Sequence, residues 1–264
     1  MKKKLAVVLA ALCICAMTAC GGKADSQAAD DQTLSAADDF VEVTDSADMA
    51  NAIDEALVTS YDDFEAADID DEIIVDTYVQ AKQDWWENTA SLYTQNREGA
   101  YYIYAMPMTK EEYDALVPGT KIRVKGYKTE WSGEVELTDA VFEVLDDDTY
   151  IAKPLDITEM LESEELIKHQ NQFICVKDMK IVPSKDADGN EAGFIYSWDG
   201  SGTDGDDLYF KVSKGGEGDP VYTFTVESYL KGPGSDVYEA VKKLEVGQTV
   251  DMEGFLYWYE SANP

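Results

Sequence analysis

Basic side chains at alternating positions are the first feature of this sequence that favours ligand chemistry. Lys121, Arg123 and Lys125 alternate with apolar residues in the stretch GTKIRVKGY. A strand would therefore place their charged heads on one outward face. Such a row can receive a phosphate, a carboxylate or an acidic glycan, or it is a solvated strand face that pairs with neighbouring acids.

Aromatic side chains form a second group. If Ile103 points inward, strand alternation places Tyr102 and Tyr104 on the outer face of the same strand. Exposed rings stack on bases or sugars, whereas buried rings cover a core or a neighbouring domain, and both readings stay open here. The candidate aromatic ligand-binding residues are Trp85, Trp86, Tyr93, Tyr102, Tyr104 and Trp131.

Catalytic motifs receive little support. The chain has one histidine, His169, with no G-x-S-x-G beside it, and it has no H-E-x-x-H pair for zinc. Cys175 lies among strand-like apolar residues, which favours a buried inert thiol over a nucleophile. We therefore expect no enzyme and no cofactor, and a carboxylate-using hydrolase is the last of the hypotheses.

Two acidic loops invite a metal or nucleotide interpretation. GSGTDG, residues 200–205, matches G-x-G-x-x-G, but the pattern predicts that a strand and not a helix follows it. Calcium is the alternative, although Glu191 stands where an EF-hand loop needs its turn glycine. Hairpin turns explain both loops without a metal. The calcium candidates are Asp186, Asp188, Asp204 and Asp206.

The first residues are typical of a secretory signal. Lysines at positions 2–4 precede an apolar run, and Met17-Thr18-Ala19-Cys20 resembles the lipobox of bacterial lipoproteins. This resemblance implies a signal peptide over residues 1–20, a lipid on Cys20 and an extracytoplasmic protein anchored to the cell membrane. An ordinary cleaved signal is the alternative.

Charge and composition divide the rest of the chain. The formal net charge is −33, which argues against a polyanionic partner such as nucleic acid. Residues 21–47 are acidic and poor in apolar side chains, so we expect a disordered tether. Apolar residues at helical spacing predict a short helical segment over 48–68.

Strand patterns dominate from residue 70. Three strands, a short helix begun by Thr109 and Glu112, and two further strands predict a small barrel over 70–150 of the oligonucleotide/oligosaccharide-binding (OB) type. Residues 151–170 read as a partly helical linker. Residues 171–264 repeat the order, with GQTVDMEGF answering GTKIRVKGY, but without the last strand. The expected fold is therefore mainly β, with two tandem OB-like barrels that each have one short helix before the fourth strand.

A family resemblance rests on QDWWENTASLYTQ, GAYYIYAM, PGTKIRVKGYKTEWSGEVEL and GDDLYFKV. The chain resembles tandem OB-fold lipoproteins of Gram-positive gut bacteria. The resemblance implies a binding module. The aromatic residues of the first barrel lead us to expect a non-catalytic module that takes an extended ligand, glycan or peptide, on that barrel's outer face. The alternatives are a protein that binds single-stranded nucleic acid and a scaffold subunit of an envelope complex.

Overall fold

A closed five-stranded barrel forms the first part of the fold in this computed structural model, which describes residues 53, 57–146 and 148–264. The barrel closes in the order β1-β2-β3-β5-β4, and β4 pairs with β1. All neighbours are antiparallel except β3 and β5, which are parallel. Its strands are β1 (Glu72–Lys82), β2 (Thr89–Gln95), β3 (Ala100–Pro107), β4 (Lys121–Trp131) and β5 (Glu134–Val144). This confirms the mainly β fold and the predicted order of elements.

Short helices begin where the sequence carries caps. Helix α3 (Lys110–Ala115) lies between β3 and β4, and Thr109 and Glu112 form the predicted reciprocal capping box. Helix α2 (Tyr61–Ala66) begins after Ser60, whose hydroxyl accepts a hydrogen bond from the Asp63 N–H. Both helices are short, so packing against the barrel and not intrinsic helix propensity must hold them.

Alternation along β4 fills the barrel. Ile122 and Val124 point into the first core and are fully buried with Leu92, Ile103 and Leu137. A core of this kind is the main source of favourable folding free energy.

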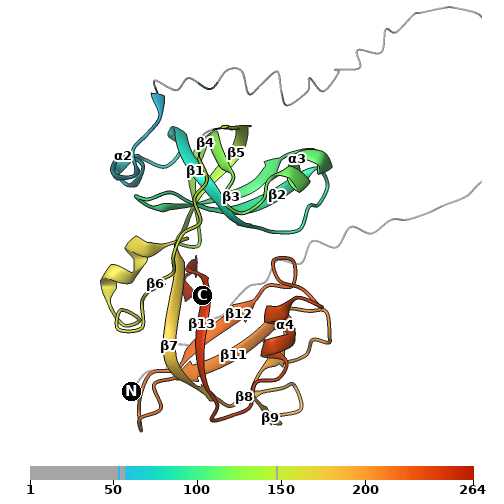
Figure 1. Cartoon of the computed structure of the whole chain (residues 1–264). Helices are drawn as coiled ribbons and strands as arrows, with labels where there is room; N and C mark the ends of the chain where they lie inside the picture. Colours follow the sequence, from blue (N-terminus) through green and yellow to red (C-terminus); the bar gives the residue numbers. More distant parts are fainter. Residues whose placement is uncertain (1–52, 54–56, 147) are drawn as a thin grey trace, which may run out of the picture. The chain divides into compact units, whose positions relative to one another are not determined.

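A second sheet with its own core follows. The linker contains β6 (Leu155–Asp156) and a 3-10 helix η2 (Glu164–His169). The central strand β7 pairs antiparallel with β11 and β13 and parallel with β6, while β12 pairs with β11 (Figure 1). This part of the chain contains β7 (Phe173–Val182), β8 (Ser184–Lys185), β9 (Glu191–Ala192), β10 (Ile195–Tyr196), β11 (Leu208–Ser213), β12 (Tyr222–Val226), α4 (Asp236–Val241), β13 (Thr249–Phe255), β14 (Tyr257–Tyr259) and β15 (Ser261–Asn263). Strands β8 and β9, and likewise β14 and β15, form separate two-stranded sheets. We call residues 155–264 the second half.

Helix α4 buries part of the face that the sequence predicts. The spacing of Val237, Ala240, Val241 and Leu244 predicts one buried face. Val241 is buried and Leu244 packs against the second core, but Val237 is exposed and Tyr238 is fully buried in its place. The Tyr238 hydroxyl donates to the Asp206 carbonyl, 2.7 Å away. A buried phenol needs such a partner, and the loop before β11 supplies it.

The repeated phrase occupies equivalent places in the two halves. Gly119 and Gly247 both follow the short helix and have φ values of +93° and +87°, which is the left-handed conformation expected of them. Val250 packs against the second core as Ile122 packs in the first. The first barrel therefore has a partial structural repeat.

The second half closes differently from the first barrel. Beyond β14, Glu260 turns the chain into β15, which pairs with β14. The Pro264 carbonyl accepts a hydrogen bond from the Thr225 N–H of β12, 3.1 Å away. Strand β15 has three residues, whereas β5, the last strand of the first barrel, has eleven. Strand β13 pairs only with β7 in the described part of the chain, whereas β4 has partners on both sides.

None of the helices in the described ranges combines the length and the apolar character needed to cross a membrane. The N-terminal signal, the tether and Cys20 lie outside the described residues.

Candidate functional site

The outer face of β2 and β3 is the surface that OB barrels use for ligands, and here it is covered. Tyr93 of β2 is 2% exposed and stacks on Phe255 with ring centroids 4.5 Å apart. Tyr102 of β3 is 4% exposed and meets Tyr257 edge-on at 5.7 Å. Both partners come from the second half. The outward placement predicted for Tyr102 is therefore right for the barrel, but the rings of Tyr93 and Tyr102 both pack against protein.

Loops beside this face also contact the second half. The Asp84 N–H, between β1 and β2, donates to the Tyr229 carbonyl at 2.8 Å. The Trp258 N–H donates to Glu134 Oε2, at the start of β5, also at 2.8 Å. Both loops that flank an OB ligand surface are thus engaged together with the β2–β3 face. We call this contact between the first barrel and the second half the seam.

The predicted basic row lies among acids. Arg123 is buried and its guanidinium contacts Asp76 at 2.7 Å and Glu143 at 3.3 Å. Lys125 pairs with Glu72 at 3.0 Å. Lys121 acts on Asp148, whose pKa is lowered mainly by a hydrogen bond from Tyr78 and less by Lys121 and Arg97. Arg123 and Lys125 therefore form ion pairs with acidic side chains of the neighbouring strands β1 and β5.

Lys128, the next cation along β4, caps a helix. Its Nζ donates to the carbonyls of Phe64, Glu65 and Ala67 at 2.7, 3.1 and 2.7 Å. These carbonyls belong to the end of α2, where backbone acceptors lack helical partners. The lysine thus attaches α2 to the barrel.

The remaining predicted aromatic residues are dispersed. Trp85 is partly buried against the first core, and its indole N–H donates to the Met108 carbonyl at 3.0 Å. Trp86 and Tyr104 are exposed. Trp131 is exposed as well and packs on Tyr259 across the seam. No single binding surface brings together all of the predicted residues.

The equivalent face of the second half remains accessible. In β11 and β12, Leu208, Phe210 and Phe224 point into the second core, so the alternate side chains face outward. These outward residues are directly paired across the two strands: Tyr209 opposite Thr225, and Lys211 opposite Thr223. All of them are partly exposed. We call this surface the β11–β12 face.

A hollow of about 190 Å³ lies at one end of the β11–β12 face. Trp198, in the loop before β11, forms one wall and is 78% exposed. The hollow is lined by Ser197, Trp198, Asp206, Asp207, Tyr209 and Ser228. It combines one freely presented indole with hydroxyl and carboxylate groups.

Hydrogen bonds fix the polar wall of this hollow. Asp207 Oδ1 accepts from both the backbone N–H and the hydroxyl of Ser228, each at 2.8 Å. Burial raises the pKa of Tyr209, and the carboxylates of Asp207 and Glu227 raise it further, so its hydroxyl stays protonated at neutral pH. The site therefore presents a neutral phenol beside a fixed carboxylate.

Sequence reasoning missed Trp198. The glycines and aspartates of GSGTDG carry the motif that the sequence offers, and Trp198 lies directly before them in SWD. A tryptophan inside a polar Gly, Ser and Asp loop has few apolar neighbours to bury it, and this signal would have found it. The structure confirms that β11, a strand, follows the loop.

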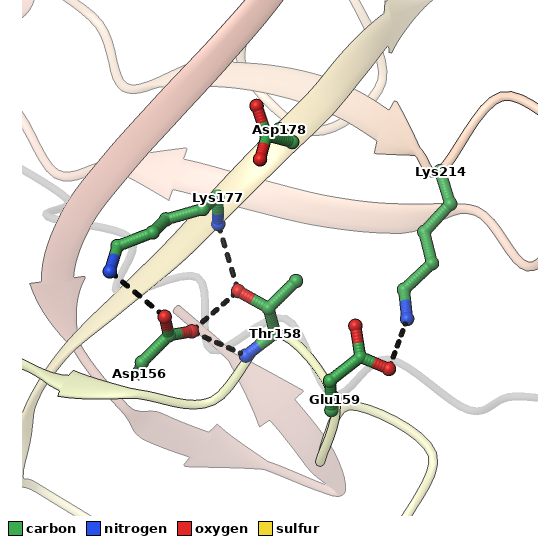
Figure 2. Close-up of a pocket in the computed structure, with 6 residues that line it drawn as sticks. All are labelled: Asp156, Thr158, Glu159, Lys177, Asp178 and Lys214. Atoms are coloured by element: carbon green, nitrogen blue, oxygen red, sulfur yellow. Dashed lines mark hydrogen bonds and ion pairs between the residues drawn. The ribbon is translucent and has the colours of Figure 1, made fainter.

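A larger hollow of about 440 Å³ lies beside β6 and β7 (Figure 2). Its two lysines are already paired, Lys177 with Asp156 at 2.9 Å and Lys214 with Glu159 at 3.0 Å. Figure 2 shows these pairs on opposite sides of Thr158. No aromatic side chain lines the hollow, and both of its lysines are already paired with acids, so it is the weaker candidate.

The acidic calcium candidates serve turns and ion pairs. Asp186 accepts hydrogen bonds from Asn190 and the Asp188 N–H, and Asp206 accepts from the Thr203 N–H. Asp204 pairs with Lys242 at 2.8 Å. Within the described ranges, no three His, Cys, Asp or Glu side chains gather where they could hold a metal ion.

Cys175 is buried, as the sequence predicts, and burial raises the pKa of its thiol. His169 lies in η2, where Nδ1 is 3.3 Å from Gln172 Oε1.

Fold and topology define the class of protein: a mainly β chain whose first half is an OB-type barrel. Similar solved structures include a murine DNA-binding protein bound to double-stranded DNA, with a TM-score of 0.31, 10% identity, and coverage of 58% of this chain and 73% of that chain. The Ifi202 HINa domain in complex with 20-bp double-stranded DNA gives a TM-score of 0.30 and 11% identity, covering 60% and 77%. Such low similarity carries no argument about the ligand. No family model matches the sequence, and no curated protein matches it.

Proposed function

We propose that the protein is a non-catalytic binding module whose open site is the β11–β12 face, and that its ligand is an extended neutral glycan. The observation that carries the proposal is Trp198, 78% exposed above the hollow. Burying an indole against a flat apolar sugar face removes apolar surface from water, while its N–H can still donate to an oxygen. Large exposed aromatic residues of this kind favour a binding role.

Polar groups around the indole suit sugar hydroxyls. Asp207 accepts hydrogen bonds, while Ser197 and Tyr209 can both donate and accept. Asp206 and Asp207, which line the hollow, lower the local potential, and this disfavours a polyanion. A neutral glycan needs no countercharge, so it fits this site better than phosphate-bearing ligands do.

The test compares two exposed tryptophans in the full chain. Glycan-array binding followed by fluorescence titration identifies a binding glycan, and the affinity is then measured for Trp198→Ala and for Trp86→Ala. Removing one aromatic stacking side chain costs about 1–3 kcal/mol of binding free energy. Trp198→Ala should therefore bind the glycan roughly five- to 150-fold more weakly. Trp86 lies on the first barrel, outside the hollow, and its variant should bind normally.

Two outcomes would oppose the proposal. Undiminished glycan binding by Trp198→Ala would remove the β11–β12 face from the function. Equal weakening by Trp86→Ala would place the ligand on the first barrel instead.

Single-stranded nucleic acid is the second candidate, and OB topology supports it because such barrels bind oligonucleotides. Its signature is affinity that falls steeply with salt, because released counterions drive the binding. Oligonucleotide titrations at two salt concentrations distinguish it from glycan binding, which should survive salt. A scaffold subunit would show neither effect and would instead copurify with an envelope protein.

Membrane attachment through Cys20 remains part of the proposal. The lipobox-like sequence before this cysteine supports it. Labelled fatty acid should be incorporated into the wild-type chain in its native cell and not into Cys20→Ala.

A further inference from the structure

A buried acid lies in the middle of the seam. Glu134, the first residue of β5, is 0% exposed. Its Oε2 accepts the Trp258 N–H, while its Oε1 has no hydrogen-bond partner among the described residues. Asn171 Oδ1 is a second buried acceptor that has no hydrogen-bond partner among the described residues. A buried acceptor without a hydrogen-bond partner is unfavourable, so a proton bound to Glu134 would relieve this arrangement.

The groups that face Glu134 bring no compensating positive charge. They are Glu136 on β5, Tyr93 on β2 and Tyr257 on β14. The neutral polar groups are the backbone N–H of Trp258, which donates to Oε2, and the side chain of Asn171, whose Nδ2 donates to the Val135 carbonyl. Glu134 takes part in no salt bridge within the described ranges. An ionised Glu134 would therefore be a buried charge without a counterion, which is strongly unfavourable.

Burial raises the pKa of Glu134 to about 8, and Glu136 adds to the rise, while Asn171 and the Trp258 N–H oppose it. Burial also raises the pKa of Glu136 and of Glu227, a second-half residue whose carboxylate accepts from Gln83 across the seam at 3.1 Å. Burial thus raises the pKa of all three acids.

We propose that Glu134 is protonated at neutral pH and that this neutral carboxyl latches the second half onto the β2–β3 face of the first barrel. A proton on Glu134 Oε1 turns an unpaired acceptor into a donor. The buried oxygen Oδ1 of Asn171 is the acceptor for it. In mild alkali the proton passes to water, the carboxylate requires hydration, and the seam loosens. Tyr93 and Tyr102, the aromatic residues of the covered face, then become accessible.

The sign of the pH effect follows from linkage. The folded-state pKa of Glu134 is raised above the usual value of about 4.3 for a solvated glutamate. The latched state therefore binds more protons than the released state between about pH 4.3 and 8. The latch contribution is full below this window, decreases across it, and is lost as the pH rises through about 8.

A direct test needs no substitution. In the ¹³C NMR spectrum of the full chain, the Glu134 carboxyl should titrate with a midpoint near pH 8, about three to four pH units above solvated glutamates. Hydrogen-exchange protection of the Trp258 and Phe173 amides, corrected for intrinsic exchange, should fall between pH 7 and 9, because both amides donate across the seam. A midpoint in the usual glutamate range would overturn the proposal.

Two matched variants separate the latch from general charge repulsion. Glu134→Gln keeps the shape and neutrality of the protonated acid, so its seam amides should stay protected through pH 9. Glu130→Gln removes an equal charge from an exposed position on β4 and should open like the wild type. If Glu134→Gln opens with the same pH profile as the wild type, the latch is refuted. If that variant does not fold, the wild-type titration decides.

Discussion

Trp131 and Tyr259 occupy the same place in the two copies of the repeated phrase, at equal offsets from Gly119 and Gly247, and they pack on each other with ring centroids 5.1 Å apart. Trp131 is the last residue of β4, and Tyr259 is the last residue of β14. The turns beyond them also meet, because the Glu260 N–H donates to the Ser132 carbonyl at 2.6 Å. The repeat therefore supplies both sides of one end of the seam.

The Trp131–Tyr259 contact predicts measurable coupling. In a double-mutant cycle, Trp131→Ala and Tyr259→Ala should show an interaction energy of about 0.5–1.5 kcal/mol, as aromatic pairs do. Urea unfolding supplies the four free energies of unfolding. As a control, Trp131→Ala combined with Trp198→Ala should be additive within about 0.3–0.5 kcal/mol. Additivity in the first cycle would mean that the ring contact stabilises nothing.

The paired glycines Gly126 and Gly254 should tolerate alanine differently. A Cβ at Gly126 would lie 2.9 Å from the Thr138 carbonyl oxygen, whereas a Cβ at Gly254 would meet nothing within 4 Å. Gly126→Ala should therefore reduce the free energy of unfolding by about 1–3 kcal/mol, because overpacking forces backbone shifts. Gly254→Ala should be close to neutral. Equal losses in chemical denaturation would contradict this explanation.

Lys128 should matter more than its neighbour Lys125. Lys128→Met removes a charged donor from three backbone carbonyls at the end of α2. We expect a loss of roughly 1.5–3 kcal/mol or more, and faster hydrogen exchange in α2. Lys125→Met breaks a partly exposed pair with Glu72 and should cost less than about 1 kcal/mol. Unchanged exchange in α2 would show that the lysine does not attach the helix.

Arg123 should act as a structural residue. Arg123→Met leaves the carboxylates of Asp76 and Glu143 without their shared partner, which should destabilise the barrel by up to about 3–5 kcal/mol. Arg97→Met breaks an exposed pair with Asp148, 3.7 Å apart, and should change stability by less than about 1 kcal/mol. Thermal unfolding of both variants makes the comparison. If Arg123→Met unfolded at the same temperature as the wild type, the basic row would again be a candidate ligand site.

Local features of the fold could be predicted because short-range rules specify them. The Thr109 capping box, the left-handed Gly119 and Gly247, and the alternation that buries Ile122 and Val124 each depend on a few adjacent residues. The exposed Val237 and buried Tyr238 could not be predicted, because the loop around Asp206 lies far away in sequence and offers the hydroxyl its partner.

The sequence by itself determined the strand order, the glycine bends and the types of side chain available for binding, since these depend on backbone conformation and on periodicity. Only the tertiary structure decided which aromatic residues remain accessible. Tyr93 and Tyr102 face outward from their own barrel, but Phe255 and Tyr257 arrive from far along the chain and cover them. Trp198 stays exposed because none of the described segments covers its indole, although Tyr238 of α4 holds the other end of the same loop through the Asp206 carbonyl. Burial depends on such long-range contacts, and no local pattern encodes them.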